Sequence, residues 1–197
     1  MTPTLNQSEL SQICLRLERL LPHFGEGDEL VLSDWGLIDL VRSIKPDLTL
    51  ILGRVLSAQK RDPRIELLDL NAADREYFRN STWNSRSSAE LLAELGICRV
   101  ELDNLIQGVA ALPMTLKGSL HLPYAMVTST RNCPFRPTPS GQPCPAPCGE
   151  VFQLRSQGGG RPLLQAGNTQ FFENPEVPER LPELGIDRLV FHSELPH

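Results

Sequence analysis

The residues best suited to chemistry are three cysteines in one proline-rich segment, TRNCPFRPTPSGQPCPAPCGE. Ten residues separate Cys133 from Cys144, and three separate Cys144 from Cys148. Because prolines restrict φ along this segment, ordering its thiols around a metal costs less entropy than in an unrestricted loop. Thiolates are soft ligands that favour iron–sulfur clusters, zinc or Cu(I) over Mg²⁺ and Ca²⁺. We therefore predict a metal site at Cys133, Cys144 and Cys148, with unliganded thiols as the alternative.

A fourth ligand is harder to assign. Structural zinc sites and [4Fe–4S] clusters usually take four protein ligands. Cys14 and Cys98 lie in apolar patterns, where a small buried thiol is the more common explanation. His121 precedes the cysteine segment on a predicted strand, where a hydrogen-bonded core or rim histidine is more common than a ligand. The fourth ligand is therefore also sought in another chain, in the substrate or in a further piece of protein.

The elements around this segment alternate helix with strand. Apolar residues at three-and-four spacing predict a helix, and short apolar runs joined to helices by few residues are typical of parallel βαβ units. Helices are predicted over 7–21, 36–44, 87–96 and 177–185, and strands over 29–33, 48–53, 97–102, 114–122, 150–156, 161–167 and 186–191. The strands 150–156 and 161–167 form a hairpin through three glycines, and 54–85 is a long, partly helical excursion. The phrases ELGICRVEL and ELGIDRLVF are alike, as in successive units of one α/β barrel.

Polar residues follow several predicted strands at their carboxyl ends, where barrel enzymes place working groups. We name Asp34, Arg54 and Asn168 as candidate substrate-binding residues. The alternative for Asp34 is a turn aspartate that caps the next helix. The alternative for Arg54 is a solvated basic segment, and for Asn168 it is a simple strand end. Arg99 lies two residues before Glu101 on one strand face, which favours an internal ion pair. Catalytic residues stay unassigned, because the sequence has no H-E-x-x-H zinc helix and no G-x-S-x-G elbow.

Composition indicates one globular α/β domain over residues 1–197, with a cysteine loop at 133–148 inside it. The chain is 40% hydrophobic and 22% charged, with a formal net charge of −5. This acidic balance argues against an unassisted nucleic-acid groove. No run approaches the ~18 apolar residues of a membrane span, and the N-terminus has no basic start or apolar core typical of a secretory signal. We therefore expect a cytoplasmic protein with reduced cysteines.

The order of several phrases resembles a known family. Four segments are similar to segments of the peptidase U32 (collagenase-like) family, most of all its UbiU/UbiV-like branch. They are LVLSDWGLIDLV, LTLILGRVLSAQKRDPR, ELGICRVELDN and LKGSLHLPYAMVTSTRNC. The matching features are the D-x-G turn at 34–36, the L-G-x-x-R-V phrase at 95–100 and the strand from Gly118 that leads to Cys133. GNTQFF and GIDRLVF are similar to the closing segment of the family, so the resemblance covers roughly residues 29–192.

The resemblance implies a TIM-type barrel with a [4Fe–4S] cluster, acting in oxygen-independent hydroxylation in ubiquinone biosynthesis or on an RNA base. Cys133, Cys144 and Cys148 match three of the four cluster cysteines of the family, and the other lies far upstream in that branch. A full barrel needs about 250 residues and about five βα units are visible, so we expect a partial TIM-type barrel, its C-terminal part. The UbiU/UbiV-like branch forms heterodimers, so a partner subunit or a missing N-terminal barrel half is expected, with a quinone precursor or RNA as substrate. The alternatives are a noncatalytic partner subunit with a structural zinc loop and a collagenase-like peptidase.

Overall fold

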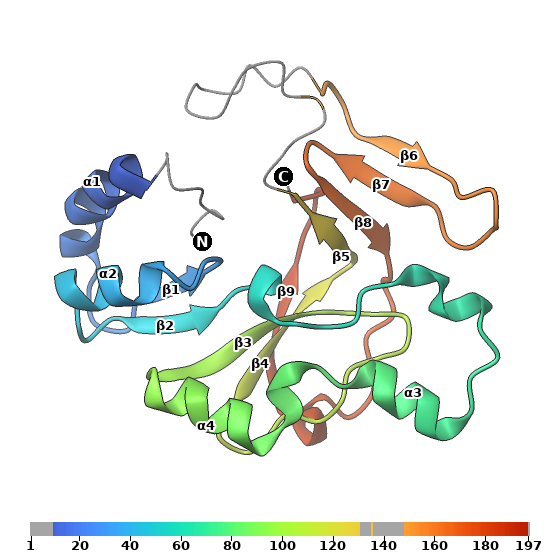
Figure 1. Cartoon of the computed structure of the whole chain (residues 1–197), viewed down its shortest axis with the longest axis horizontal. Coiled ribbons are helices and arrows are strands. Elements are labelled where there is room, and N and C mark those ends of the chain that lie inside the picture. Colours follow the sequence, from blue (N-terminus) through green and yellow to red (C-terminus); the bar gives the residue numbers. More distant parts are fainter. Residues whose placement is uncertain (1–9, 131–134, 136–147, 197) are drawn as a thin grey trace.

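The computed structural model describes residues 10–130, 135 and 148–196. Two sheets form its frame, a parallel sheet packed against helices and an antiparallel sheet that continues from it (Figure 1). The α-helices are α1 (Leu10–Leu20), α2 (Leu37–Ile44), α3 (Ala72–Arg79) and α4 (Arg86–Glu94). The 3-10 helices are η1 (Leu21–His23), η2 (Arg54–Leu56), η3 (Pro63–Leu67), η4 (Thr82–Asn84) and η5 (Leu181–Leu184). No helix in this part of the chain is long and apolar enough to cross a membrane.

The parallel sheet has the strand order β1-β2-β3-β4-β9, with every neighbouring pair parallel. Its strands are β1 (Glu29–Leu32), β2 (Thr49–Leu52), β3 (Ile97–Asp103), β4 (Lys117–Leu122) and β9 (Ile186–Phe191). All five strands therefore end at the same side of the sheet, which we call the carboxyl edge. The βαβ pattern expected from the sequence is confirmed here, because α2 connects β1 to β2 and α4 precedes β3.

One face of this sheet is apolar and packs against the helices. Leu32, Leu50, Leu52 and Leu120 are completely buried, in one cluster with residues of α1, α2 and α4. Fully burying such a side chain stabilises the fold by about 1.5–3 kcal/mol. Alternate residues point to the opposite face, because side chains of a strand alternate with a period of two.

The parallel sheet is strongly curled toward this opposite face. In a flat sheet, strand spacing of ~4.8 Å would place the outer strands β1 and β9 about 19 Å apart. Yet Nη1 of Arg188 on β9 lies 2.6 Å from Oε2 of Glu29 on β1. The two side chains could not meet across a flat sheet, so the curl brings the outer strands toward each other.

The antiparallel sheet has the order β5-β8-β7-β6. Its strands are β5 (Tyr124–Ser129), β6 (Phe152–Leu154), β7 (Leu163–Ala166) and β8 (Thr169–Glu173). Because β5 follows β4 across the single residue Pro123, this sheet begins at the carboxyl edge of the parallel one. Buried Ala125 and Phe172 pack together with Leu105, which follows β3.

The structure differs from the sequence expectation in three elements. The hairpin of β6 and β7 is confirmed, but β5 and β8 were not expected as strands. The expected helix at 177–185 is reduced to η5, because Pro182 has no backbone N–H to continue a helix.

Candidate functional site

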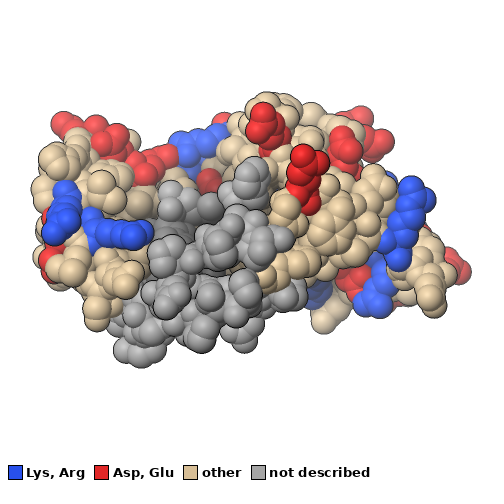
Figure 2. Space-filling model, turned by 90° about the horizontal axis from the view of Figure 1, so that it is seen from above, with Lys and Arg blue, Asp and Glu red and all other residues tan. Residues whose placement is uncertain are grey.

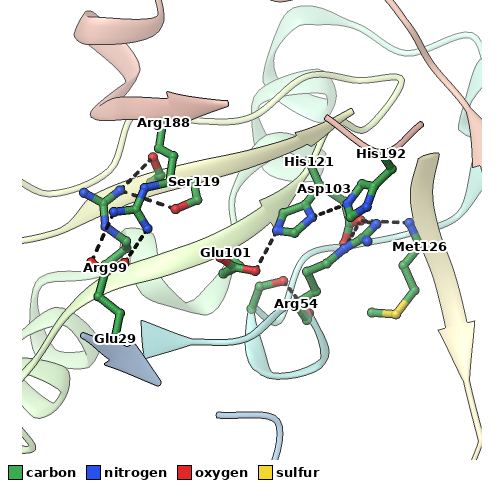
Figure 3. A network of polar contacts seen from close by, with 12 residues as sticks. Glu29, Arg54, Arg99, Glu101, Asp103, Ser119, His121, Met126, Arg188 and His192 are labelled. Carbon is green, nitrogen blue, oxygen red and sulfur yellow. Dashed lines mark hydrogen bonds and ion pairs between the residues drawn. The ribbon is translucent and has the colours of Figure 1, made fainter. Parts of the chain in front are cut away.

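Polar side chains of β3 occupy the face of the sheet opposite the helices. Arg99, Glu101 and Asp103 alternate with apolar residues, so all three share that face. Asp103, at the carboxyl edge, is completely buried. Figure 3 shows two groups of polar contacts along this face, one at the start of the strands and one at the carboxyl edge.

Asp103 holds two arginines in a buried ionic cluster. Oδ1 of Asp103 accepts a hydrogen bond from Nε of Arg54 (2.9 Å) and Oδ2 accepts one from Nε of Arg61 (2.9 Å). Nη2 of Arg54 also bonds Oδ1, and the backbone N–H of Met126 donates to the same oxygen at 2.8 Å. Burial raises the pKa of Asp103, but the two guanidinium groups and these hydrogen bonds outweigh it and hold the pKa below its ordinary value. Asp103 is therefore a buried carboxylate at neutral pH.

The segment after β2 is fixed to β3 by a glutamine. The side chain of Gln59 donates to the carbonyl of Asp103 (3.0 Å) and accepts from its backbone N–H (2.7 Å). Ser57 donates to the carbonyl oxygen of Arg54 (2.9 Å). These bonds mimic the pairing of one more strand residue, which explains why polar residues without helical periodicity pack in the interior.

A second chain of contacts joins one carboxylate and two histidines (Figure 3). Oε2 of Glu101 lies 2.6 Å from Nε2 of His121, and Nδ1 of His121 lies 2.7 Å from Nε2 of His192. Glu101 and His121 are buried, whereas His192 is partly exposed. Burial lowers the pKa of His192, and the nearby charges of His121 and Arg54 lower it further. The Glu101–His121–His192 chain thus leads from the interior toward solvent and ends on a neutral imidazole.

The direction of the two hydrogen bonds depends on the tautomers of the histidines. With Glu101 as a carboxylate and both imidazoles neutral, Glu101 accepts the Nε2 proton of His121, and Nδ1 of His121 accepts the Nε2 proton of His192. Nδ1 of His192 is then the basic atom at the outer end. Such an arrangement can take up a proton at His192 and stabilise the resulting charge through Glu101, as a general base requires.

At the start of the strands, the ion pairs differ from the expected ones. Arg99 pairs with Asp187 on β9, at 2.6 Å between Nη1 and Oδ1, so the expected pair of Arg99 with Glu101 is wrong. Nη1 of Arg99 also contacts Oγ of Ser119 (3.3 Å). The bond to Asp187 holds the pKa of that carboxyl below its ordinary value. Ser119 lies on the neighbouring strand β4, and Asp187 lies one strand further, on β9, which the curl brings close to the face that carries Arg99.

The turn between β7 and β8 holds both ends of the cysteine segment. Asn168 donates from Nδ2 to the carbonyl of Thr130 (2.6 Å), and its own carbonyl accepts from the N–H of Thr130 (3.1 Å). At the other end, a Cβ placed on Gly167 would lie 3.9 Å from Sγ of the partly buried Cys148. Of the predicted metal ligands, Cys133 and Cys144 lie outside the described residues. Thr130 and Cys148 thus lie at the same turn.

The other predicted residues are bound to different partners. Asp34 accepts a hydrogen bond from the N–H of Gly36 (3.0 Å), as a turn aspartate does, and Arg54 is taken up by Asp103. Cys98 is exposed at the start of β3, the end opposite the carboxyl edge, and Cys14 lies in α1. Within the described part of the chain, no three His, Cys, Asp or Glu side chains group as metal ligands would.

Sequence reasoning missed the joint role of the two histidines. His121 was expected as a hydrogen-bonded core or rim histidine, which is confirmed, but His192 was not singled out. The available signal was position: Glu101, His121 and His192 each lie at or beside the carboxyl end of a strand, on the same face.

Comparisons of the whole chain with protein-family models, curated proteins and solved structures find no match.

Proposed function

We propose that this chain binds a [4Fe–4S] cluster through Cys133, Cys144 and Cys148 and works in an oxygen-independent hydroxylation system of the cytoplasm. The resemblance to the UbiU/UbiV-like branch of the peptidase U32 family suggests a quinone precursor or an RNA base as substrate. The observation that carries the proposal is the turn at 167–168, which contacts Thr130 before the cysteine segment and Cys148 at its end.

Closing the segment at its base favours metal binding. Bringing the two ends of a chain segment together costs entropy. Here the hydrogen bonds between Asn168 and Thr130, and the position of Cys148 beside Gly167, already hold both ends at one turn. The prolines between the cysteines reduce this entropy cost further. Three thiols are a donor set that fits a cluster or zinc, and both are bound as thiolates.

The fourth ligand is proposed to come from a partner. Cys98 lies at the end of the parallel sheet opposite the antiparallel sheet, whose β7–β8 turn lies beside Cys148, so it is poorly placed to complete the set. Within the described residues, β1 and β9 each pair with one strand only, and proteins normally cover such edges. A partner subunit, or a further barrel half, would cover these edges and turn the curled sheet into part of a TIM-type barrel.

The residues of this chain would handle protons at the carboxyl edge of the parallel sheet. When bound, a cluster supplies electron transfer or oxygen-atom chemistry. His192 would accept or return a proton at Nδ1, and Glu101 would stabilise the charge through His121. The Asp103 cluster keeps Arg54 and the start of β5 fixed at the same edge, which holds this arrangement rigid.

The test compares two cysteine variants in the full chain, purified without oxygen. Cys148→Ser should remove most bound metal and the visible absorption, whereas the matched control Cys98→Ser should keep both. Equal metal content in the two variants would refute the assignment. Far-UV circular dichroism of each variant checks that the fold is retained.

A further inference from the structure

A cleft lies between η3 and the β6–β7 hairpin, away from the histidine chain. Its volume is about 470 Å³, within the range of pockets that hold small organic ligands. The hairpin is fixed to η3 by Arg161, whose N–H and Nε bond the two carboxylate oxygens of Glu66 at 2.7 and 2.9 Å. Gly160, beside Leu67 of η3, has a positive φ of 92°, a backbone conformation that glycine adopts without strain.

The charged lining of this cleft is mostly positive. It contains Arg61, Arg64, Arg155 and Arg161 against Asp62, in a chain whose net charge is −5. Figure 2 shows basic side chains at the right-hand end of the molecule, where Figure 1 places the β6–β7 hairpin. A positive cleft on an acidic chain concentrates small anions.

The guanidinium groups are held in place by ion pairs, but not all of their N–H donors are used. Arg61 is held by Asp103, Arg64 by Asp62 and Arg161 by Glu66. A guanidinium has five N–H donors, and each of these three arginines keeps a terminal nitrogen without a hydrogen bond to the described residues. Arg155 has no ion pair with any described residue. The cleft therefore offers oriented donors that a carboxylate or phosphate accepts in pairs.

The rest of the lining is apolar. Pro63, Val127, Leu154 and Leu163 contribute to the wall, and Val127 and Leu163 also pack against the small core below the antiparallel sheet. An inorganic anion would contact only the arginines and would leave the apolar wall of the cleft exposed to water. A ligand with an anionic group and an apolar body would use both parts of the lining.

We propose that this cleft binds a small organic anion, a carboxylate or phosphate monoester on an apolar body. The proposal does not depend on the metal site, because none of the cysteines lines the cleft among the described residues. Arg61 connects the two regions, since it lines the cleft and bonds Asp103 at the carboxyl edge. A bound anion would lie beside the buried ionic cluster.

The test is isothermal titration calorimetry of the full chain with benzoate, phenyl phosphate, inorganic phosphate and benzyl alcohol. We expect benzoate or phenyl phosphate to bind, and inorganic phosphate and the neutral alcohol to bind at least tenfold more weakly. The stronger of the two organic anions identifies the anionic group. Arg155→Gln and Arg64→Gln should each weaken that binding about tenfold, the loss of one charge-assisted bond.

The matched control is Arg180→Gln. Its side chain is 72% exposed and pairs with Glu183, much as Arg64 is 71% exposed and pairs with Asp62, but Arg180 lies outside the cleft. Binding in the control should equal that of the unchanged chain. The proposal is overturned if neither organic anion binds or if the cleft variants bind as the control does.

Discussion

Replacing Asp103 with asparagine should destabilise the fold far more than any exposed charge change. The variant keeps the size of the side chain and one oxygen, which can still accept from the N–H of Met126 (2.8 Å). It removes the negative charge between Arg54 and Arg61, whose side chains are only 7% and 11% exposed. The amide nitrogen would also face N–H donors of one arginine, so a hydrogen bond becomes a repulsive contact.

The expected loss follows from this geometry. Removing one partner of a buried ion pair costs about 3–5 kcal/mol, because the other charge stays buried and uncompensated. Domains of this kind have a free energy of unfolding of about 5–15 kcal/mol, so the variant should still fold. With a urea slope of about 2 kcal/mol per molar, the unfolding midpoint should fall by about 2 M.

The assay is urea unfolding followed by far-UV circular dichroism at pH 7, with Asp62→Asn as the control. Asp62 also binds an arginine, but its side chain is 52% exposed and the pair is worth at most about 1 kcal/mol. A midpoint shift for Asp103→Asn no larger than that of the control would refute the view that Asp103 organises the carboxyl edge.

Three further predictions test other parts of the structure. Folding lowers the pKa of His192, so the unfolded chain binds a proton at this residue first as the pH falls through about 6.5. The free energy of unfolding should therefore drop from pH 7 to pH 5, and the drop should be smaller in His192→Gln. Urea unfolding at each pH measures both. Asn168→Ala removes the bond to Thr130, so it should cost about 1 kcal/mol and reduce retained metal in metal analysis, and unchanged metal would argue against the role of the turn. A double-mutant cycle of Glu29→Gln and Arg188→Gln should give a coupling free energy of unfolding of about 0.5 kcal/mol. Zero coupling would mean that the curl does not bring these two side chains of the outer strands together in solution.

The alternation of helix and strand could be predicted from the sequence because it is a local property. The apolar runs at 29–32 and 49–52 and the helical spacing at 37–44 each carry their own pattern, and the structure confirms all three elements. The strand β8 has two apolar residues, Phe171 and Phe172, between polar ones, so it lacks the apolar run that marks β1, whereas β5 begins with an apolar run that sequence reasoning missed. Their pairing with each other makes them strands, and pairing is not local.

The candidate site was predictable only in outline. The polar residues named from the sequence follow strands at their carboxyl ends, where Asp103 also lies, but their partners could not be named. The partner of Asp103 lies 49 residues earlier and that of His121 lies 71 residues later. A basic residue such as Arg54 has the same sequence signature whether it is solvated or buried in an ion pair. Its partner depends on the curl and on the order of strands, which no short stretch of sequence specifies.

The measurement that tests the central claim most directly is iron, sulfide and zinc analysis of the full chain purified without oxygen, with its visible absorption spectrum. The proposed cluster predicts iron and sulfide near four each per chain or per complex, with broad absorption that oxygen bleaches. One zinc per chain without sulfide would instead favour a structural zinc loop in a noncatalytic subunit. The absence of both metals, in the chain alone and with its partner present, would contradict the assignment of Cys133, Cys144 and Cys148 as ligands.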